Sequence, residues 1–525
     1  MSDPTPVHDP LAFSTWRRRL WPIHAYELKK FLPMLLMSFF ISFVYSILRN
    51  TKDSLIVTAP DGGADLIPFL KVYAVIPASV LYMLGYAKLS NILSKRRLFH
   101  VALAPFLVFF AIFPALYAIR ESIQPVALFA RWHYHLPAWL ATLAALARHW
   151  TFALFYVMAE LWGSAALALL FWGFANDIVK VEESRRFYAL FSLGANLALV
   201  FVKFANHLIH ALERRLTDHF HMGSWAAYLD VLMVVVLGCV LAVLAVYRWI
   251  HRHVLTDPRF YSPEERLALH AGRPRMSARE AFRFLAGSRY LVAIAILVIG
   301  YGIALNLIEV TWKTHLGVLC PHPRDYQDFM ANFSMATGLT TIALTLFVAN
   351  NVIRSFGWTA AALVTPVVMV LTGTGFFGFI LMEERLAPVL AGYGTTPLAV
   401  AVLFGAAQNV MSKAAKYALF DPTKEMAYIP LDEESKVKGK AAIEVVGSRL
   451  GKAGGSAIQQ ALIAVHHSLR AVPGQIAAIL LVIIGAWMWA AVDLGRRYTR
   501  LVAGGRSLAG APVRVPDVRP GWRRP

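Results

Sequence analysis

The stretch LPMLLMSFFISFVYSIL, residues 32–48, decides the class of this protein. A helix that crosses a bilayer needs about 20 predominantly apolar residues, and this run approaches that length. Similar runs recur along the chain, for example VALAPFLVFFAIFPALYAI at 101–119 and VLMVVVLGCVLAVLAVY at 231–247. They predict an all-α integral membrane protein, because the strands of an outer-membrane barrel would be short and would alternate in polarity.

The composition agrees with a membrane protein. Of the 525 residues, 58% are hydrophobic and 16% are charged, against about 45–50% and about 25% in soluble domains. The net charge of +20 comes from basic residues that gather in alternate loops, which is typical of positive-inside topology and not of a nucleic-acid partner. With only Cys239 and Cys320, neither a disulfide framework nor a cysteine-based metal site is expected.

The order of apolar runs and basic loops predicts about twelve spans in two six-helix halves, a major-facilitator-like organisation. Both termini should be cytoplasmic, and the absence of a signal or transit peptide favours a bacterial inner membrane. The eleventh span, near 437–465, is the least apolar. We expect these divisions: a cytoplasmic arm at 1–30, a bundle at 31–248, a basic linker at 249–288, a second bundle at 289–496 and a basic tail at 497–525.

Charged residues inside the predicted spans narrow the function. Each costs about 2.5–3.5 kcal/mol on insertion scales and therefore tends to mark a transport pathway. In such a bundle the first and fourth helices of each half line the central cavity. Those spans, with span two, carry most of the candidate residues: Arg49, Lys52, Lys71, Glu160, Asn176, Glu309, Lys313, Asn409 and Lys413.

Each of these residues also has a structural explanation. Glu309 and Lys313 are four residues apart and would pair on one helix. Lys71 would reach an interface by snorkelling, and Glu160 would form a structural salt bridge. Arg49 and Lys52, near the predicted end of span one, would be interfacial.

A second stretch, DPTKEMAYIPLDEESKVKGKAAIEVVGSRLGKAGGSAIQQ at 421–460, interleaves lysines and glycines between two apolar segments. It suggests a site for a large anion and adds Lys424, Glu425, Lys440 and Lys452 to the candidates, although Lys424 and Glu425 would also suit an ordinary loop. The segment is not a phosphate loop, because Ala453 follows Lys452 where that motif requires Ser or Thr. Its glycines would permit close helix packing or the approach of an anion.

Several motifs resemble the nucleotide transporter family, the ATP/ADP translocases of obligate intracellular bacteria and plastids. They are RNTKDSLIVTAPDGGADLIPFLK at 49–71, AELWGS at 159–164, FWGFAN at 171–176, NLIEVTWK at 306–313 and the 421–460 block. The resemblance extends from about residue 26 to about residue 496. It implies twelve transmembrane helices and exchange of ATP against ADP. It also implies substrate-handling roles for Lys71, Glu160, Glu309 and one or more of Lys424, Lys440 and Lys452.

The expected function is therefore ATP/ADP exchange by alternating access. Lys and Arg would bind the phosphates, and the buried glutamates would balance the charge so that the anion can leave. No cofactor, metal or enzymatic activity is expected, since no nucleophile–base set or ligand cluster is evident. The partners would be ATP, ADP and the bilayer, with a monomer as the working expectation. Proton-coupled import of other nucleotides and a non-transporting nucleotide sensor stay open as alternatives.

Overall fold

The computed structural model describes residues 23–60, 62–124, 138–179, 181–220, 224–257, 260, 287–431, 439, 443 and 447–503. Helices dominate this part of the chain, which contains no strand. Eleven helical segments within it are long and apolar enough to cross a membrane. The expected α-helical membrane fold is confirmed.

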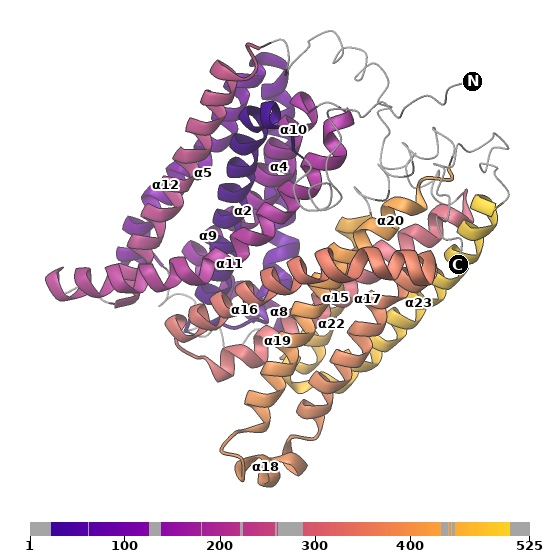
Figure 1. The fold of residues 1–525 in the computed structure, drawn as a ribbon. Helices are drawn as coiled ribbons and strands as arrows, with labels where there is room; N and C mark the ends of the chain where they lie inside the picture. The colour runs from indigo at the N-terminus through magenta and orange to yellow at the C-terminus, as the bar shows by residue number, and fades with distance from the viewer. Residues whose placement is uncertain are drawn as a thin grey trace.

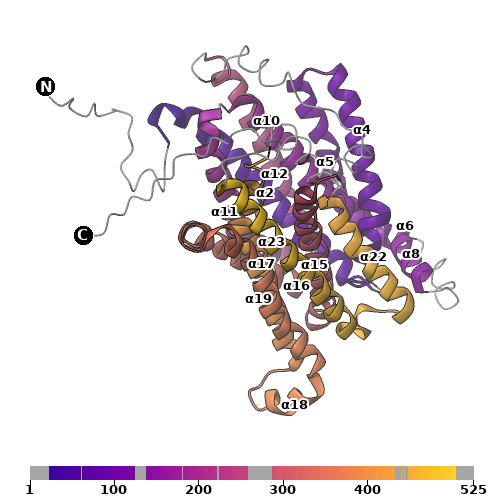
Figure 2. The same ribbon diagram turned by 90° about the vertical axis from the view of Figure 1, so that its right-hand side faces the viewer.

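One group of helices comes from the first part of the chain, drawn in indigo to magenta in Figures 1 and 2. Its members are α2 (Leu28–Val57), α3 (Leu66–Phe69), the π-helix η2 (Leu70–Val75), α4 (Ile76–Ile92), α5 (Lys95–Ala118), α6 (Arg120–Ile123), α8 (Ala138–Arg148), α9 (Trp150–Trp162), the π-helix η4 (Gly163–Phe171), α10 (Trp172–Ile178), α11 (Val181–Phe220) and α12 (Ser224–His253). A short 3-10 turn, η1 (Ala25–Glu27), precedes them. We call α2–α12 the N-terminal half.

The C-terminal half, drawn in pink to yellow, lies beside it (Figure 1). It contains α15 (Arg289–Leu319), α16 (Pro323–Ala343), the π-helix η5 (Leu344–Ala349), α17 (Asn350–Leu381), α18 (Glu383–Ala391), α19 (Pro397–Ala415), the π-helix η6 (Lys416–Phe420), α20 (Asp421–Ala427), α22 (Ser448–His466), the 3-10 turn η8 (Leu469–Ala471) and α23 (Pro473–Ala503). The short α18 forms the tip that projects between α17 and α19.

Local sequence signals set many helix starts. Thr396 caps α19 by accepting a hydrogen bond from the Ala399 backbone N–H at 3.2 Å, and Pro397 follows at the first helical position. Pro323 and Pro473 begin α16 and α23. Proline suits this position because its missing N–H would have no helical partner there.

Two helices run further than the apolar pattern indicates. Helix α2 continues to Val57 and α15 to Leu319, about two turns beyond the span ends near 50 and 312 that the apolar pattern predicts. Lys52 and Lys313 therefore lie inside helices, with 2% and 3% of their side chains exposed. The interfacial alternative for Lys52 is wrong, because ion pairs on neighbouring helices satisfy its charge in the interior.

Glycines bring α22, the expected weak eleventh span, against α15. A Cβ atom on Gly302 would lie 2.9 Å from the Gly451 Cα, and one on Gly455 would lie 2.8 Å from the Asn306 Nδ2. The two backbones approach so closely that only glycine fits, as in membrane helix pairs with small residues at the crossing. The packing explanation of the glycines in the 421–460 stretch is confirmed.

Hydrogen bonds join the two halves at the end where α2 finishes, which we call the closed end. Ser54 Oγ donates to the Pro323 carbonyl at 2.8 Å, and Asn50 Nδ2 donates to Ser334 Oγ at 3.0 Å. On the other flank of the closed end, Ser468 Oγ donates to Asp65 Oδ2 at 2.8 Å. The opposite end carries the starts of α2 and α5 and the end of α12.

Candidate functional site

Charged side chains from the first and fourth long helices of each half converge between the halves. Helix α2 contributes Arg49, Lys52 and Asp53, which lie on one face because they are three and four residues apart. Helix α9 contributes Glu160. From the other half, α15 contributes Glu309 and Lys313, and α19 contributes Lys413.

Six of these seven charges, all except Arg49, form one chain of alternating ion pairs. Lys52 Nζ lies 3.1 Å from Glu160 Oε1 and 2.7 Å from Asp53 Oδ1. The Asp53 Oδ2 lies 2.8 Å from Lys313 Nζ. Lys313 continues to Glu309 Oε1 at 3.0 Å, and Lys413 Nζ lies 3.3 Å from the same oxygen.

This chain is arranged similarly in the two halves. An ion pair links the first and fourth long helices of each half: Lys52 with Glu160, and Glu309 with Lys413. The Asp53–Lys313 pair then bridges the halves. The pairing of Glu309 with Lys313 that the sequence suggests is present. Glu309 also forms an ion pair with Lys413, so its charge does not serve Lys313 alone.

Arg49 lies against this chain without a matching acceptor. It is within electrostatic reach of Glu309 and Asp53. Its Nε and Nη2 are nevertheless buried without a hydrogen-bond partner among the described residues. A buried donor left unsatisfied costs about 1–3 kcal/mol, more when it is charged. The guanidinium is thus prepared for an anionic acceptor.

Helices η2 and α22 add two further lysines. Lys71 Nζ donates to Asn306 Oδ1, which joins the halves. Asn306 Nδ2 donates to the Lys452 carbonyl at 3.2 Å and to Ser456 Oγ at 3.0 Å. The Lys452 side chain is exposed and lies within electrostatic reach of Glu160.

The group therefore has an excess of positive charge. We call the nine residues of this group the charge cluster: Arg49, Lys52, Asp53, Lys71, Glu160, Glu309, Lys313, Lys413 and Lys452. Six members are basic and three are acidic, so the formal net charge is three positive. Among the described residues no group of His, Cys, Asp and Glu could hold a metal ion. The chemistry of the cluster suits a multivalent anion.

π-helical segments adjoin the cluster on three elements. Lys71 lies within η2, η4 begins three residues after Glu160, and η6 begins three residues after Lys413. A π-helix widens the turn and often occurs at functional sites. Here each π-helix contains a charge of the cluster or begins three residues after one.

The contacts recorded for the remaining candidates lie outside the charge cluster. Asn176 Oδ1 accepts a hydrogen bond from the Tyr188 hydroxyl at 2.7 Å, and Asn409 Nδ2 donates to the Gly405 carbonyl at 2.9 Å within α19. On α20, Lys424 Nζ lies 3.5 Å from Glu425 Oε1. Lys440 lies outside the described residues.

The sequence did not single out two residues that help to build this site, Asp53 and Asn306. Asp53 is fully buried and bridges the halves, yet in the sequence it is one more charge near a predicted span end. Asn306 binds both Lys71 and α22. The available signals were the helical spacing of Asp53 from Arg49 and the position of Asn306, three residues before Glu309.

Known proteins resemble the chain over nearly its whole length. Residues 8–498 match the family described as TLC ATP/ADP transporter. The ADP,ATP carrier protein 1 of Chlamydia pneumoniae is 50% identical over 93% of this chain and 94% of its own. The chloroplastic ADP,ATP carrier protein 1 of Arabidopsis thaliana is 44% identical over 92% of this chain and 76% of its own. The ADP,ATP carrier protein 1 of Rickettsia bellii is 40% identical, over 93% and 97%.

Solved structures share the fold. A crystal structure of a D-xylose-proton symporter has a TM-score of 0.53 at 14% identity, covering 90% of this chain and 97% of that one. An inward-open structure of the xylose transporter XylE from E. coli has a TM-score of 0.51, also at 14% identity, covering 90% and 96%. These likenesses confirm the major-facilitator-like fold, and the sequence matches confirm the resemblance drawn from the motifs: the chain belongs to the TLC ATP/ADP transporter family.

Proposed function

We propose that this protein exchanges ATP for ADP across its membrane by alternating access, with the charge cluster as the phosphate site. The family and the carrier proteins that share up to half of its residues support exchange. A single observation carries the site: two buried donors of Arg49, Nε and Nη2, have no hydrogen-bond partner among the described residues and lie within a cluster whose net charge is positive. Polyphosphates need several charge-assisted donors, and guanidinium groups bind them in a two-pronged manner.

Of the candidate lysines Lys424, Lys440 and Lys452, we assign Lys452 to the phosphates. It lies within electrostatic reach of Glu160, and its backbone carbonyl accepts a hydrogen bond from Asn306, which also binds Lys71. Lys424 lies on α20 with Glu425. Glu160 and Glu309 offset part of the cationic field, because a purely positive cavity would retain the anion and transport requires release.

We further propose that both termini face the cytoplasm of a bacterial cell and that the protein lies in the inner membrane. Supporting this, Arg96, Arg97, Arg248 and Arg252 all lie at the end where α2 begins, as expected for the inner side. The closed end would then face outward, and the cluster would be loaded from the cytoplasm in this conformation.

The test is uptake of labelled ATP into proteoliposomes with ADP inside or absent. Exchange requires internal ADP, whereas a proton-coupled importer would respond to a proton gradient and a sensor would bind without uptake. Arg49→Gln should raise the KM for ATP about tenfold or more, because it removes a charge-assisted phosphate contact. Arg385→Gln, which removes an exposed arginine on α18, is the matched control. An unchanged KM in Arg49→Gln would refute the site assignment.

A further inference from the structure

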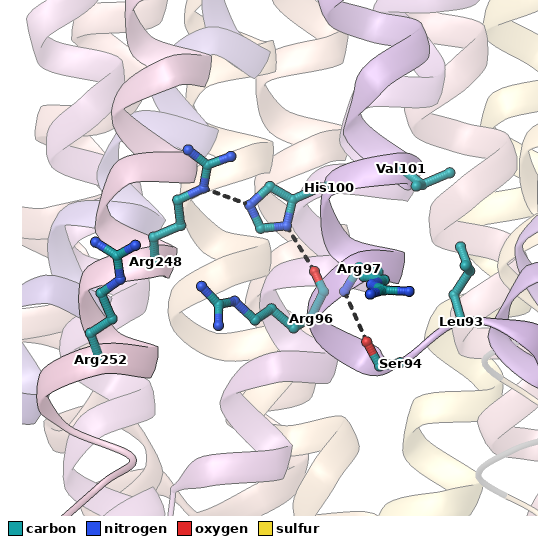
Figure 3. Close-up of a pocket in the computed structure, with 8 residues that line it drawn as sticks. All are labelled: Leu93, Ser94, Arg96, Arg97, His100, Val101, Arg248 and Arg252. Carbon is teal, nitrogen blue, oxygen red and sulfur yellow. Dashed lines mark hydrogen bonds between the residues drawn. The ribbon is translucent and has the colours of Figure 1, made fainter.

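A second cationic site lies outside the charge cluster, where α5 begins and α12 ends. A pocket of about 700 Å³ there is lined by Arg96, Arg97, His100, Arg248 and Arg252, together with Ser94 and the apolar residues Leu93 and Val101. Figure 3 shows the guanidinium groups of Arg248 and Arg252, from α12, on the same side of the pocket as Arg96 of α5. Nothing in the transport mechanism uses these residues.

In the part of the chain that the structure describes, no carboxylate pairs with the arginines that line this pocket. The acidic side chain facing this region from α10 is Asp177, and Lys95 already pairs with it at 2.9 Å. Among the described residues, none of the four arginines forms an ion pair. Four such groups lining one pocket cost electrostatic energy, which an anion would recover.

Two hydrogen bonds of His100 orient part of the site. The His100 Nδ1 lies 2.7 Å from the Arg96 carbonyl, so this nitrogen carries the proton and donates. The His100 Nε2 then accepts from Arg248 Nε at 3.0 Å, as the dashed line in Figure 3 shows. Because Nε is occupied, Arg248 is left with its two terminal nitrogens for a ligand. Terminal guanidinium nitrogens in this arrangement match two oxygens of a phosphate.

An apolar track leads from the pocket toward the middle of the membrane. On α5, Val101, Val108 and Ile112 follow Arg97 by one, three and four turns, and their exposed fractions are 40%, 57% and 49%. On α12, Leu241 lies two turns before Arg248 and is 57% exposed. In a bilayer these side chains contact acyl chains, so the pocket and the track together match a phosphate with a hydrocarbon tail.

We propose that this pocket binds a phosphate group, supplied by an anionic membrane phospholipid whose chains follow the α5–α12 track. Positive-inside topology explains why basic residues lie at this end, but it does not require four arginines to line one pocket. Basic pockets between membrane helices on the inner side commonly hold anionic headgroups.

The experiment is native mass spectrometry of the full-length protein with added phosphatidylglycerol, phosphatidylcholine or inorganic phosphate. Arg97→Gln/Arg248→Gln is compared with Arg289→Gln/Arg500→Gln, which removes the same charge from exposed sites on the C-terminal half. One phosphatidylglycerol per wild-type chain is expected, with affinity about tenfold or more weaker in the pocket variant and unchanged in the control. Arg252→Gln provides a milder variant if the double substitution does not fold.

If inorganic phosphate displaces phosphatidylglycerol and reaches the same occupancy of the pocket, the phosphate site is supported but is assigned to a soluble anion. Equal retention of phosphatidylcholine, or equal affinity in the pocket and control variants, would overturn the proposal. Exchange of nucleotides in neutral lipid should persist in the pocket variant, since the pocket lies apart from the charge cluster.

Discussion

The three carboxylates of the charge cluster differ in exposure, and the difference separates their roles. Asp53 is fully buried between two lysines, whereas 22% of the Glu160 side chain and 17% of the Glu309 side chain are exposed. Removing one partner from a buried ion pair leaves an uncompensated charge and costs about 3–5 kcal/mol. Asp53 therefore stabilises the contact between the halves, and we propose that the more exposed glutamates meet the substrate and change partners.

Glu160→Gln should lower the turnover of exchange about tenfold without lowering expression. In this variant Lys52 keeps its ion pair with Asp53 but loses its ion pair with residue 160. The cluster therefore gains positive charge and holds the anion longer. The measurement is the initial exchange rate in proteoliposomes as a function of ATP concentration. Glu121→Gln, at a carboxylate that is 83% exposed, is the matched control. Unaltered kinetics in Glu160→Gln would remove Glu160 from the mechanism.

At the scale of elements, close packing and local widening of helices position the cluster. The α15–α22 crossing sets Asn306 against Lys452, and the π-helices turn neighbouring segments beside Lys71, Glu160 and Lys413. Gly163, at the start of η4, also admits the Tyr45 ring, since a Cβ there would lie 2.5 Å from its Cε2 atom. These contacts depend on the absence of a side chain.

Gly302→Ala should destabilise the protein by about 1–3 kcal/mol, because the added methyl group meets the Gly451 backbone, which cannot rotate away. Gly238→Ala on α12 is the matched control. Its added methyl group meets nothing within 4 Å, so it should be neutral or stabilise by up to about 1 kcal/mol. Thermal unfolding in one detergent measures both. Equal melting temperatures for the two variants would show that the crossing is not tightly packed.

At the scale of the whole molecule, contacts on both flanks of the closed end hold this conformation. On one flank, α3 and the residues before it contact α22 and the turn that follows it. Gln460 Nε2 donates to the Pro68 carbonyl at 3.0 Å, and Ser468 Oγ donates to Asp65 Oδ2 at 2.8 Å. The other flank joins α11 to α16 through His210 Nε2 and Asp328 Oδ1 at 2.8 Å. Alternating access requires both flanks to separate.

A disulfide across the closed end should therefore stop exchange. Asp65→Cys/Ser468→Cys, in a chain whose Cys239 and Cys320 are replaced by Ser, should lose exchange on oxidation and regain it on reduction, because side-chain oxygens there lie 2.8 Å apart. Each single cysteine variant controls for the loss of the native contact. Full exchange by the cross-linked protein would show that this end does not open.

The sequence by itself determined the membrane class, nearly all the spans and the four helices that carry the charges, because hydropathy and helical periodicity are local properties. Helix ends at 57 and 319 were missed because α2 and α15 continue through charges that only tertiary partners can satisfy. The ion pairs were decided by the tertiary structure. Glu309 and Lys413 are 104 residues apart, and which side chains meet depends on helix rotation and on how the halves close, which no local pattern records.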